Sequence, residues 1–145
     1  MLIYTIDFAT PEFDEALAIR YEVLRKPLGL DYSLEQIATE WDNIHIAAFD
    51  ASGKMTGYLN LTPVDDKLVK MRQVAVAPAY QGQGIGKAMV AYSEMVAKDR
   101  NFTEIVLHAR KAAVPFYLSM HYEIVGDEFE EVLIPHFKMR KALGF

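Results

Sequence analysis

Residues 80–87 read YQGQGIGK and place three glycines at alternate positions of the chain. Glycine loses more conformational freedom on folding than other residues, so an ordered segment this rich in glycine needs a physical reason. The segment follows an apolar run typical of a β-strand and precedes residues with the periodicity of an α-helix. Backbone N–H groups at the start of a helix carry the positive end of its dipole and can bind a phosphate. The stretch therefore predicts either a cradle for a pyrophosphate or a plain glycine-rich turn.

Two common phosphate-binding patterns do not fit this stretch. The dinucleotide fingerprint, read from Gly82, requires a glycine where the sequence has Lys87. The Walker A pattern requires serine or threonine where the sequence has Ala88. It also requires a glycine five residues before Gly86, where the sequence has Gln81. The pattern that remains is a strand, a proline, Gln-x-x-Gly-x-Gly and a helix.

Length and composition narrow the class of protein. The 145 residues, 52% of them hydrophobic, predict a single domain over residues 1–145. A formal net charge of −5 argues against a nucleic-acid partner. Cysteine is absent and the four histidines show no ligand spacing, so no metal site is expected. The sequence shows no signal peptide and no run of 18 apolar residues, so we expect a cytoplasmic protein without a membrane partner.

Strand and helix patterns alternate along the chain. The turn ASG at residues 51–53 suits an antiparallel hairpin, and hairpins mixed with crossovers predict a mixed sheet covered by helices. Helices are predicted from Pro11 to Pro27, from the glycine stretch to Arg100 and at 111–120, and a short helix or loop at 33–42. Strands are predicted at residues 2–8, 44–50, 54–64, 67–78, 104–110, 122–129 and 134–141.

Two motifs together resemble the GCN5-related N-acetyltransferase (GNAT) superfamily. Residues 81–86, which follow VAVAPAY, resemble its acyl-CoA signature. The run RKAAVPFYLSMHY resembles its fourth-helix motif, with Ala113, Tyr117 and Tyr122 on the Ala, Tyr and Phe places. The resemblance covers nearly the whole chain in element order. It implies an α/β (α+β) fold with a mixed, mostly antiparallel central sheet of six to seven strands flanked by about four helices.

The sequence departs from the fourth-helix motif at three positions. Arg110, Ser119 and His121 stand where the family has Asn, Lys and Gly. The missing Asn removes a hydrogen bond expected for the pantetheine arm of the cofactor. The missing Gly changes the turn into the following strand.

The resemblance implies an acetyl-CoA site made mostly of backbone groups. The pyrophosphate would lie on the glycine stretch, and the pantetheine arm would pair with a strand that separates from its neighbour at a bulge. A backbone N–H near Val74 would hold the acetyl carbonyl, and Lys111 is a looser candidate for the 3′-phosphate. The implied cofactor-binding residues are Val74, Ala75, Val76, Gln81, Gly82, Gln83, Gly84, Ile85, Gly86, Lys87, Arg110, Ala113 and Phe116.

Direct transfer of an acetyl group to an amine needs a base and an acid. A free alkylamine, with a pKa of about 10.4, is almost fully protonated at pH 7, so a base must remove its proton. Tyr117 stands where the family has its general acid, and a tyrosine is suited to protonating the CoA thiolate. From the residues alone, Tyr117 would instead be a core aromatic of a short helix.

The general base is left open by the resemblance. Histone-type members of the family carry a glutamate four residues before the Val74 position, and the sequence has Lys70 there. Acidic loop residues could equally be solvated charges, and a strand histidine could equally be a hydrogen-bonded structural residue. The candidates for the base or the acceptor side of the site are Glu40, Asp42 and His136, with His108 also considered.

The resulting hypothesis is an acetyl-CoA-dependent N-acetyltransferase that transfers the acetyl group directly to a primary amine of a small molecule. The alternatives are a protein lysine or N-terminal acetyltransferase and a non-catalytic CoA-binding sensor module. The acidic run GDEFEEV (126–132) either attracts a cationic amine or is a solvated loop. The chain end, FKMRKALGF, is apolar, so a homodimer and a monomer both stay open.

Overall fold

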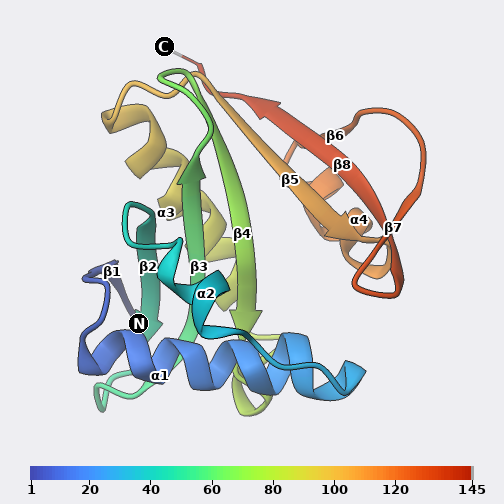
Figure 1. Cartoon of the computed structure of the whole chain (residues 1–145). Helices are drawn as coiled ribbons and strands as arrows, with labels where there is room; N and C mark the ends of the chain where they lie inside the picture. The colour runs from blue at the N-terminus through green and yellow to red at the C-terminus, as the bar shows by residue number, and fades with distance from the viewer. Residues whose placement is uncertain (145) are drawn as a thin grey trace. The chain divides into compact units, whose positions relative to one another are not determined.

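The computed structural model describes residues 1–144, so Phe145, the last residue of the apolar chain end, lies outside the described residues (Figure 1). The described chain divides into two compact units. Unit 1 comprises residues 1–62 and 73–93, and unit 2 comprises residues 63–72 and the residues from 94 onward. Strand β4 (Leu68–Val76) and helix α3 (Ile85–Asp99) each run through both units.

Unit 1 is built on antiparallel strands that lie side by side (Figure 1). β1 (Leu2–Ile6) pairs with β2 (Ile44–Phe49), which pairs with β3 (Met55–Pro63). The predicted hairpin between β2 and β3 is confirmed as antiparallel, and Gly53 closes its turn with a φ of 87°. The end of β4 continues this sheet beyond β3, where Ala77 N–H donates to the Thr56 carbonyl.

The helices of unit 1 begin at capping residues that the sequence already carries. Helix α1 (Pro11–Arg20) starts at Thr10, whose side-chain oxygen accepts the Phe13 N–H. Beyond Arg20 the chain continues as a π-helical turn at 21–25 and a 3₁₀ turn at 26–28, and it ends at Gly29 with a φ of 67°. Helix α2 (Leu34–Ala38) carries a capping box between Ser33 and Gln36.

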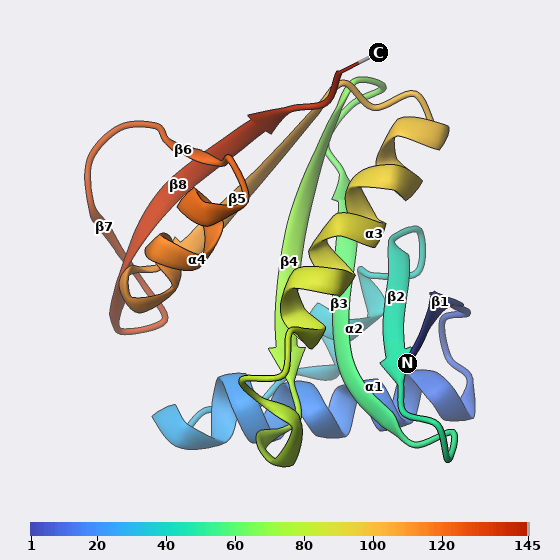
Figure 2. The ribbon, with the colours of Figure 1, turned by 180° about the vertical axis from the view of Figure 1, so that it is seen from behind.

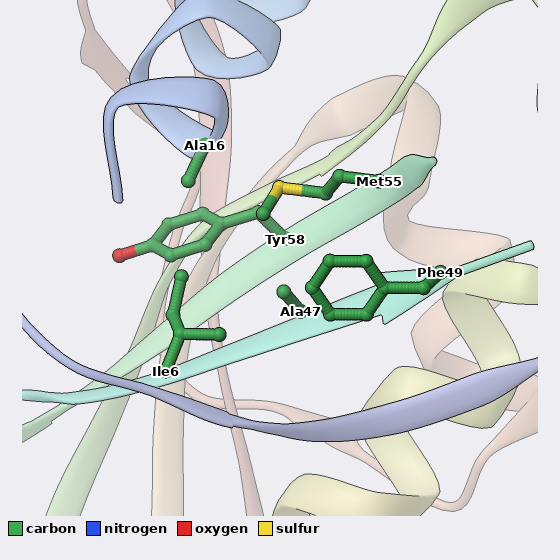
Figure 3. Close-up of a cluster of buried hydrophobic side chains, with 6 residues drawn as sticks. All are labelled: Ile6, Ala16, Ala47, Phe49, Met55 and Tyr58. Carbon is green, nitrogen blue, oxygen red and sulfur yellow. The ribbon is translucent and has the colours of Figure 1, made fainter. Parts of the chain in front are cut away.

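A buried apolar cluster fills unit 1 (Figure 3). It joins one side chain each of β1 and α1 to the facing strands β2 and β3, and its members are Ile6, Ala16, Ala47, Phe49, Met55 and Tyr58. The first half of α3 lies against β3 (Figure 2). There a Cβ on Gly57 would come within 2.8 Å of Met89 Cε and 3.3 Å of the Ala75 carbonyl oxygen, so a larger residue would require the Met89 side chain to move.

Unit 2 has β5 (Glu104–Arg110) between two partners of opposite direction. β5 runs parallel to the start of β4, from Leu68↔Glu104 to Met71↔Leu107, and antiparallel to β8 (Ile134–Ala142). Two short strands, β6 (Glu123–Ile124) and β7 (Phe129–Glu131), also pair with β8. A 3₁₀ turn at 111–113 leads into α4 (Val114–Ser119), and Pro115 lies in its first turn as predicted.

The described residues form a mixed, mostly antiparallel sheet in the order β1-β2-β3-β4-β5-β8-β6, with β7 on β8. The predicted fold class is therefore confirmed, with eight strands in the described chain instead of six to seven. The strand predicted over 122–129 is wrong, because only Glu123–Ile124 forms it and β7 is separate. Gly126, with a φ of 82°, turns the chain between the two short strands.

Candidate active site

The glycine stretch forms the loop that starts α3 in unit 1. Gly82 and Gly84 have φ values of 78° and 82°, and Gly86 lies in the first turn of α3. A Cβ on Gly82 or Gly84 would meet nothing within 4 Å, so the left-handed backbone, and not crowding, requires glycine there. The first helical hydrogen bond runs from Ala88 N–H to the Gly84 carbonyl. The preceding N–H groups of the first turn thus have no helical partner and fit an anion.

Side chains on both sides of the glycines hold this loop in place. Gln81 Nε2 donates to the Val76 carbonyl at 3.0 Å, and Gln83 Nε2 donates to the Ala79 carbonyl at 3.4 Å. Tyr80 donates its hydroxyl to Asp50 Oδ2 at 2.8 Å, which ties the loop to the β2–β3 hairpin. Lys87 is exposed in the first turn of α3. The loop is therefore fixed by the protein, while the Cβ directions of Gly82 and Gly84 face open space.

A bulge interrupts β4 directly before Val74. Gln73 has a φ of 57°, an unusual value for a residue with a side chain. Its Oε1 accepts a 2.6 Å hydrogen bond from the Tyr32 hydroxyl, and the Tyr32 ring lies 4.8 Å and 4.5 Å from the guanidinium carbons of Arg20 and Arg25. Val74, Ala75 and Val76 follow the bulge, with Ala75 buried.

Glu40 lies in a buried polar network of unit 1. Its two carboxylate oxygens accept bonds of 2.7 Å and 2.8 Å from Arg20, and both side chains are almost fully buried. His45 Nε2 lies 3.0 Å from the Glu40 carbonyl, which can only accept, so this nitrogen carries a proton. His45 Nδ1 then accepts from Tyr58, and burial lowers the pKa of His45. Asp42, two residues further on, is exposed.

The paired geometry favours a structural role for Glu40. Both of its carboxylate oxygens already accept hydrogen bonds from the buried guanidinium, so neither is free to accept a proton from a substrate. Asp42 stays a candidate on the acceptor side, because its side chain is exposed.

Tyr117 lies on α4 in unit 2 and is 6% exposed. Its ring packs edge-on against Phe116 and Tyr122 at centroid distances of 5.0 Å and 5.7 Å. Burial raises the pKa of Tyr117 to about 12, so the hydroxyl keeps its proton at neutral pH. Ala113 and Arg110 are half-buried just before α4. The arrangement gives unit 2 a rigid, protonated phenol that can act as a proton donor.

The exposed cation Lys111 has a partner in unit 2. Its Nζ lies 3.0 Å from Glu128 Oε1, and both side chains are largely in solvent. Such an exposed pair is weak and exchanges readily with solvent. Lys111 could therefore still bind a phosphate, as the resemblance implies.

A second polar cluster in unit 2 includes two of the histidines. Glu131, on β7, has Oε1 at 3.1 Å from His108 Nδ1 and Oε2 at 3.7 Å from His136 Nε2. Lys70 Nζ lies 3.3 Å from the same His108 Nδ1. Burial alone would raise the pKa of Glu131, but the His108 hydrogen bond and the neighbouring positive groups outweigh it and lower that pKa. Burial, followed by the charge of Arg72, lowers the pKa of Lys70.

Sequence reasoning had no means to find Glu131. The acidic run 126–132 and His136 were both noted, but only the register Phe129↔His136 of β7 on β8 brings them together. His136 is almost fully buried, and its Nδ1 donates to the Ile134 carbonyl at 2.9 Å. His136 stays a candidate on the acceptor side, and the more exposed ring of the cluster is that of His108.

Within residues 1–144, no group of three or more His, Asp or Glu side chains is placed to hold a metal ion. None of the helices in the same range is long and apolar enough to cross a membrane.

Comparisons with known proteins agree with this arrangement. A solved structure of a candidate N-acetyltransferase from Lactobacillus plantarum aligns over 99% of each chain with a TM-score of 0.85 at 23% identity. An aminoglycoside 6′-N-acetyltransferase, solved with coenzyme A, aligns over 99% of this chain and 97% of that chain with a TM-score of 0.82 at 18% identity. At these identities the likeness shows the fold.

A sequence relative and a family model add to the structural likeness. The protein YyaT of Bacillus subtilis is 32% identical over 75 residues, which cover 52% of this chain and 51% of YyaT, so the match spans about half of that relative. The model of the acetyltransferase (GNAT) domain matches residues 22–143. This range includes the glycine loop, the β4 bulge, Tyr117 and the Glu131 cluster. The chain therefore belongs to the acetyltransferase (GNAT) family of acyltransferases.

Proposed function

We propose that the chain is an acetyl-CoA-dependent N-acetyltransferase that transfers the acetyl group directly to a primary amine of a small molecule. The observation that carries the proposal is the loop before α3, where Gly82 and Gly84 are left-handed and open on the side where a Cβ would point. Such a loop fits a pyrophosphate bound by N–H groups at a helix start. The coenzyme A bound to the aminoglycoside 6′-N-acetyltransferase with the same fold supports this choice of cofactor.

The chain's own residues take separate tasks in this proposal. When bound, acetyl-CoA supplies a thioester that an amine can attack. The N–H groups of residues 81–87 hold its pyrophosphate, and the backbone of residues 74–76 pairs with its pantetheine arm. Arg110, Ala113 and Phe116 of unit 2 are further cofactor-binding residues in this proposal. The Val74 N–H stabilises negative charge on the carbonyl oxygen. Tyr117 donates its proton to the departing sulfur.

The bulge at Gln73 supports the task assigned to Val74. A residue of left-handed φ turns the direction of the next backbone groups, so an N–H beyond it can leave the ladder and point at a ligand. The Tyr32 hydroxyl holds the Gln73 side chain, and two arginines flank the Tyr32 ring. A donor fixed before the reaction needs no reorganisation when charge develops, which is the physical basis of this kind of catalysis.

The class of acceptor rests on two further points. Position 70 is a lysine, so the glutamate base of histone-type members is missing. Solved structures of the same fold include aminoglycoside acetyltransferases. A protein lysine or N-terminal acetyltransferase is the second candidate, and a non-catalytic CoA-binding sensor module is the third.

The test is release of the CoA thiol from acetyl-CoA, measured against pooled small amines and, separately, against lysine-containing peptides. Amine-dependent release with a small-molecule pool is the expected result. Release with peptides alone would replace the small-amine acceptor by a protein. Tight acetyl-CoA binding without release in any pool would favour the sensor module, and absence of binding would overturn the reading of the glycine loop. Light scattering of the same sample separates a homodimer from a monomer.

A further inference from the structure

Glu131 brings an unusual set of proton-carrying groups together in unit 2. Its carboxylate lies 3.1 Å from His108 Nδ1, and Lys70 Nζ lies 3.3 Å from the same nitrogen. His136 Nε2 lies 3.7 Å from the other carboxylate oxygen. The Phe129 ring packs edge-on against His108 at 5.0 Å and stacks with His136 at 5.9 Å, so it fixes both imidazole rings. These five side chains come from four strands, β4, β5, β7 and β8.

The atoms around His108 Nδ1 allow two proton arrangements. A carboxylate only accepts, so the contact with Glu131 requires a proton on Nδ1. A lysine ammonium only donates, so the contact with a charged Lys70 requires a lone pair on Nδ1. In the first arrangement the neutral imidazole carries its lone pair on Nε2, and in the second it carries a proton there. The charge of Lys70 therefore competes with Glu131 for the tautomer of His108.

The side chains differ in their access to solvent. The His108 side chain is 27% exposed and that of Glu131 is 43% exposed, whereas that of His136 is 4% exposed. The side-chain contacts of His108 with Lys70 and Glu131 both use Nδ1. A carboxylate that orients Nδ1–H, with Nε2 turned to a substrate, is the geometry of an imidazole general base.

We propose that His108 is the general base of the acetyl transfer, that Glu131 is the residue that positions it, and that Lys70 is the competing donor that withdraws it from this role. This inference rests on the proposed function, because it assigns the step that an amine acceptor requires. His108 and Glu131 would thus together do the work of the glutamate that histone-type members of the family carry at the position of Lys70.

The step balances without any further reactant. His108 Nε2 takes one proton from the acceptor ammonium, and the freed nitrogen lone pair forms the bond to the acetyl carbon. The bond from that carbon to sulfur breaks, and the sulfur keeps the electron pair and receives the Tyr117 proton. A second proton leaves the new amide nitrogen, and solvent restores the neutral imidazole and the protonated phenol.

The first test compares His108→Gln with wild type over pH 6–10.5, using the amine pool that supports thiol release. A general base contributes about 10²–10⁴-fold, so kcat/KM of the variant falls by about that factor at pH 7. Near pH 10.5 about half of the acceptor is neutral by itself, so the deficit shrinks to less than about tenfold. A purely structural role would give a deficit that does not change with pH. His121→Gln, at an exposed histidine of the α4–β6 turn, is the matched control and keeps the wild-type profile.

The second test distinguishes the roles of Glu131 and Lys70, because their variants should shift the pH profile of kcat/KM in opposite directions. Glu131→Gln removes a negative charge from the imidazolium, so the acidic limb of kcat/KM moves to lower pH and the maximum falls about tenfold or more. Lys70→Met removes a positive charge, so the acidic limb moves to higher pH. Arg72 and Lys138 also carry charge near Lys70 and are unchanged in both variants. Glu130→Gln, at the exposed neighbour of Glu131, is the control. Shifts in the same direction would overturn the positioning roles.

The third test does not depend on any acceptor and so remains informative if the proposed function fails. Long-range ¹H–¹⁵N spectra of the side chains distinguish the two imidazole tautomers, and the four histidines are assigned with single His→Gln variants. We expect the Nδ1–H tautomer for His108 in wild type at pH 8–9 and its loss in Glu131→Gln. An Nε2–H tautomer of His108 over this range, with Nδ1 accepting from Lys70, would overturn the inference whatever the acceptor is.

Discussion

Tyr117 shows at the scale of one residue how burial can fix a proton in place. The ring is held edge-on by Phe116 and Tyr122, and burial raises the pKa of Tyr117 to about 12. A general acid works only while it is protonated, so activity that depends on it is lost as pH rises through its pKa. We expect no loss from this group below about pH 11, whereas a tyrosine of ordinary pKa would begin to fail near pH 9.

The corresponding variant is Tyr117→Phe, which removes the hydroxyl and keeps the ring that packs in α4. Because only the proton donor is lost, we expect kcat to fall about 10²-fold while the Kd of acetyl-CoA stays within about twofold. Stopped-time thiol assays and calorimetric titration with acetyl-CoA measure the two quantities. An unchanged kcat would refute the assignment of Tyr117 as the acid.

The Arg20–Glu40 pair is the other residue-scale feature that invites a measurement. Both side chains are almost fully buried and share two hydrogen bonds, so Glu40→Gln leaves an uncompensated buried cation. We expect a loss of about 3–5 kcal/mol in the free energy of unfolding, measured with urea. The double variant Arg20→Met/Glu40→Leu removes both charges and is expected to recover most of that loss.

The exposed pair Lys26–Glu22, at 3.5 Å, is the matched control for the buried one. Glu22→Gln should change the free energy of unfolding by less than about 1 kcal/mol, because solvent screens the pair. If Glu40→Gln were equally mild but lowered kcat/KM strongly, the carboxylate would be the base and the structural role of Glu40 would be wrong.

At the scale of elements, the loop before α3 can be tested against a turn of the same backbone geometry. Gly84 and Gly53 have φ values of 82° and 87°, and a Cβ on either would meet open space. Ala at each site is therefore strained only by its left-handed backbone, and each variant should lose about 1–2 kcal/mol of stability. Only Gly84→Ala should also weaken acetyl-CoA binding, by about tenfold or more in Kd. Equal affinities of the two variants would show that the loop does not hold the cofactor.

Elements with strong local signals were predicted well from the sequence. The strand at 104–110 has the predicted ends, and α1 begins at Pro11 as predicted. The segment 122–131 was predicted poorly, because β6 and β7 are two and three residues long and depend on pairing with β8. Strands this short carry too little periodicity to be read without their partner.

The candidate site also has one part that the sequence predicts and one part that it does not. The glycine loop precedes its helix directly in the sequence, so its residues and their backbone role could be predicted together. The Glu131 cluster depends on the contacts of His108 with Lys70 and Glu131, which are 38 and 23 positions away in the sequence, and no local pattern encodes it. Lys70 itself was read only as a missing glutamate, although its contact with His108 gives it a role of its own.

The whole described chain can be tested for cooperativity. Unit 1 and unit 2 share the continuous strand β4 and the continuous helix α3. Unfolding of either unit would therefore break an element on which the other depends. We expect one thermal transition, with equal van't Hoff and calorimetric enthalpies in differential scanning calorimetry. A calorimetric enthalpy well above the van't Hoff value would show that the units unfold separately and that the prediction of a single domain is wrong.

The path of the chain through the two units also decides which pieces of the protein can be made. It passes from one unit to the other after residues 62, 72 and 93, so unit 1 is not a continuous stretch of sequence. A gene fragment that stops at Ser93 would encode every residue of unit 1 but would also carry residues 63–72 of unit 2, in which Leu68–Met71 of β4 would lack their partner β5. Neither unit can thus be expressed alone by simple truncation, and a split reporter or a deletion library built on this protein would yield soluble halves only if the fragments are produced together.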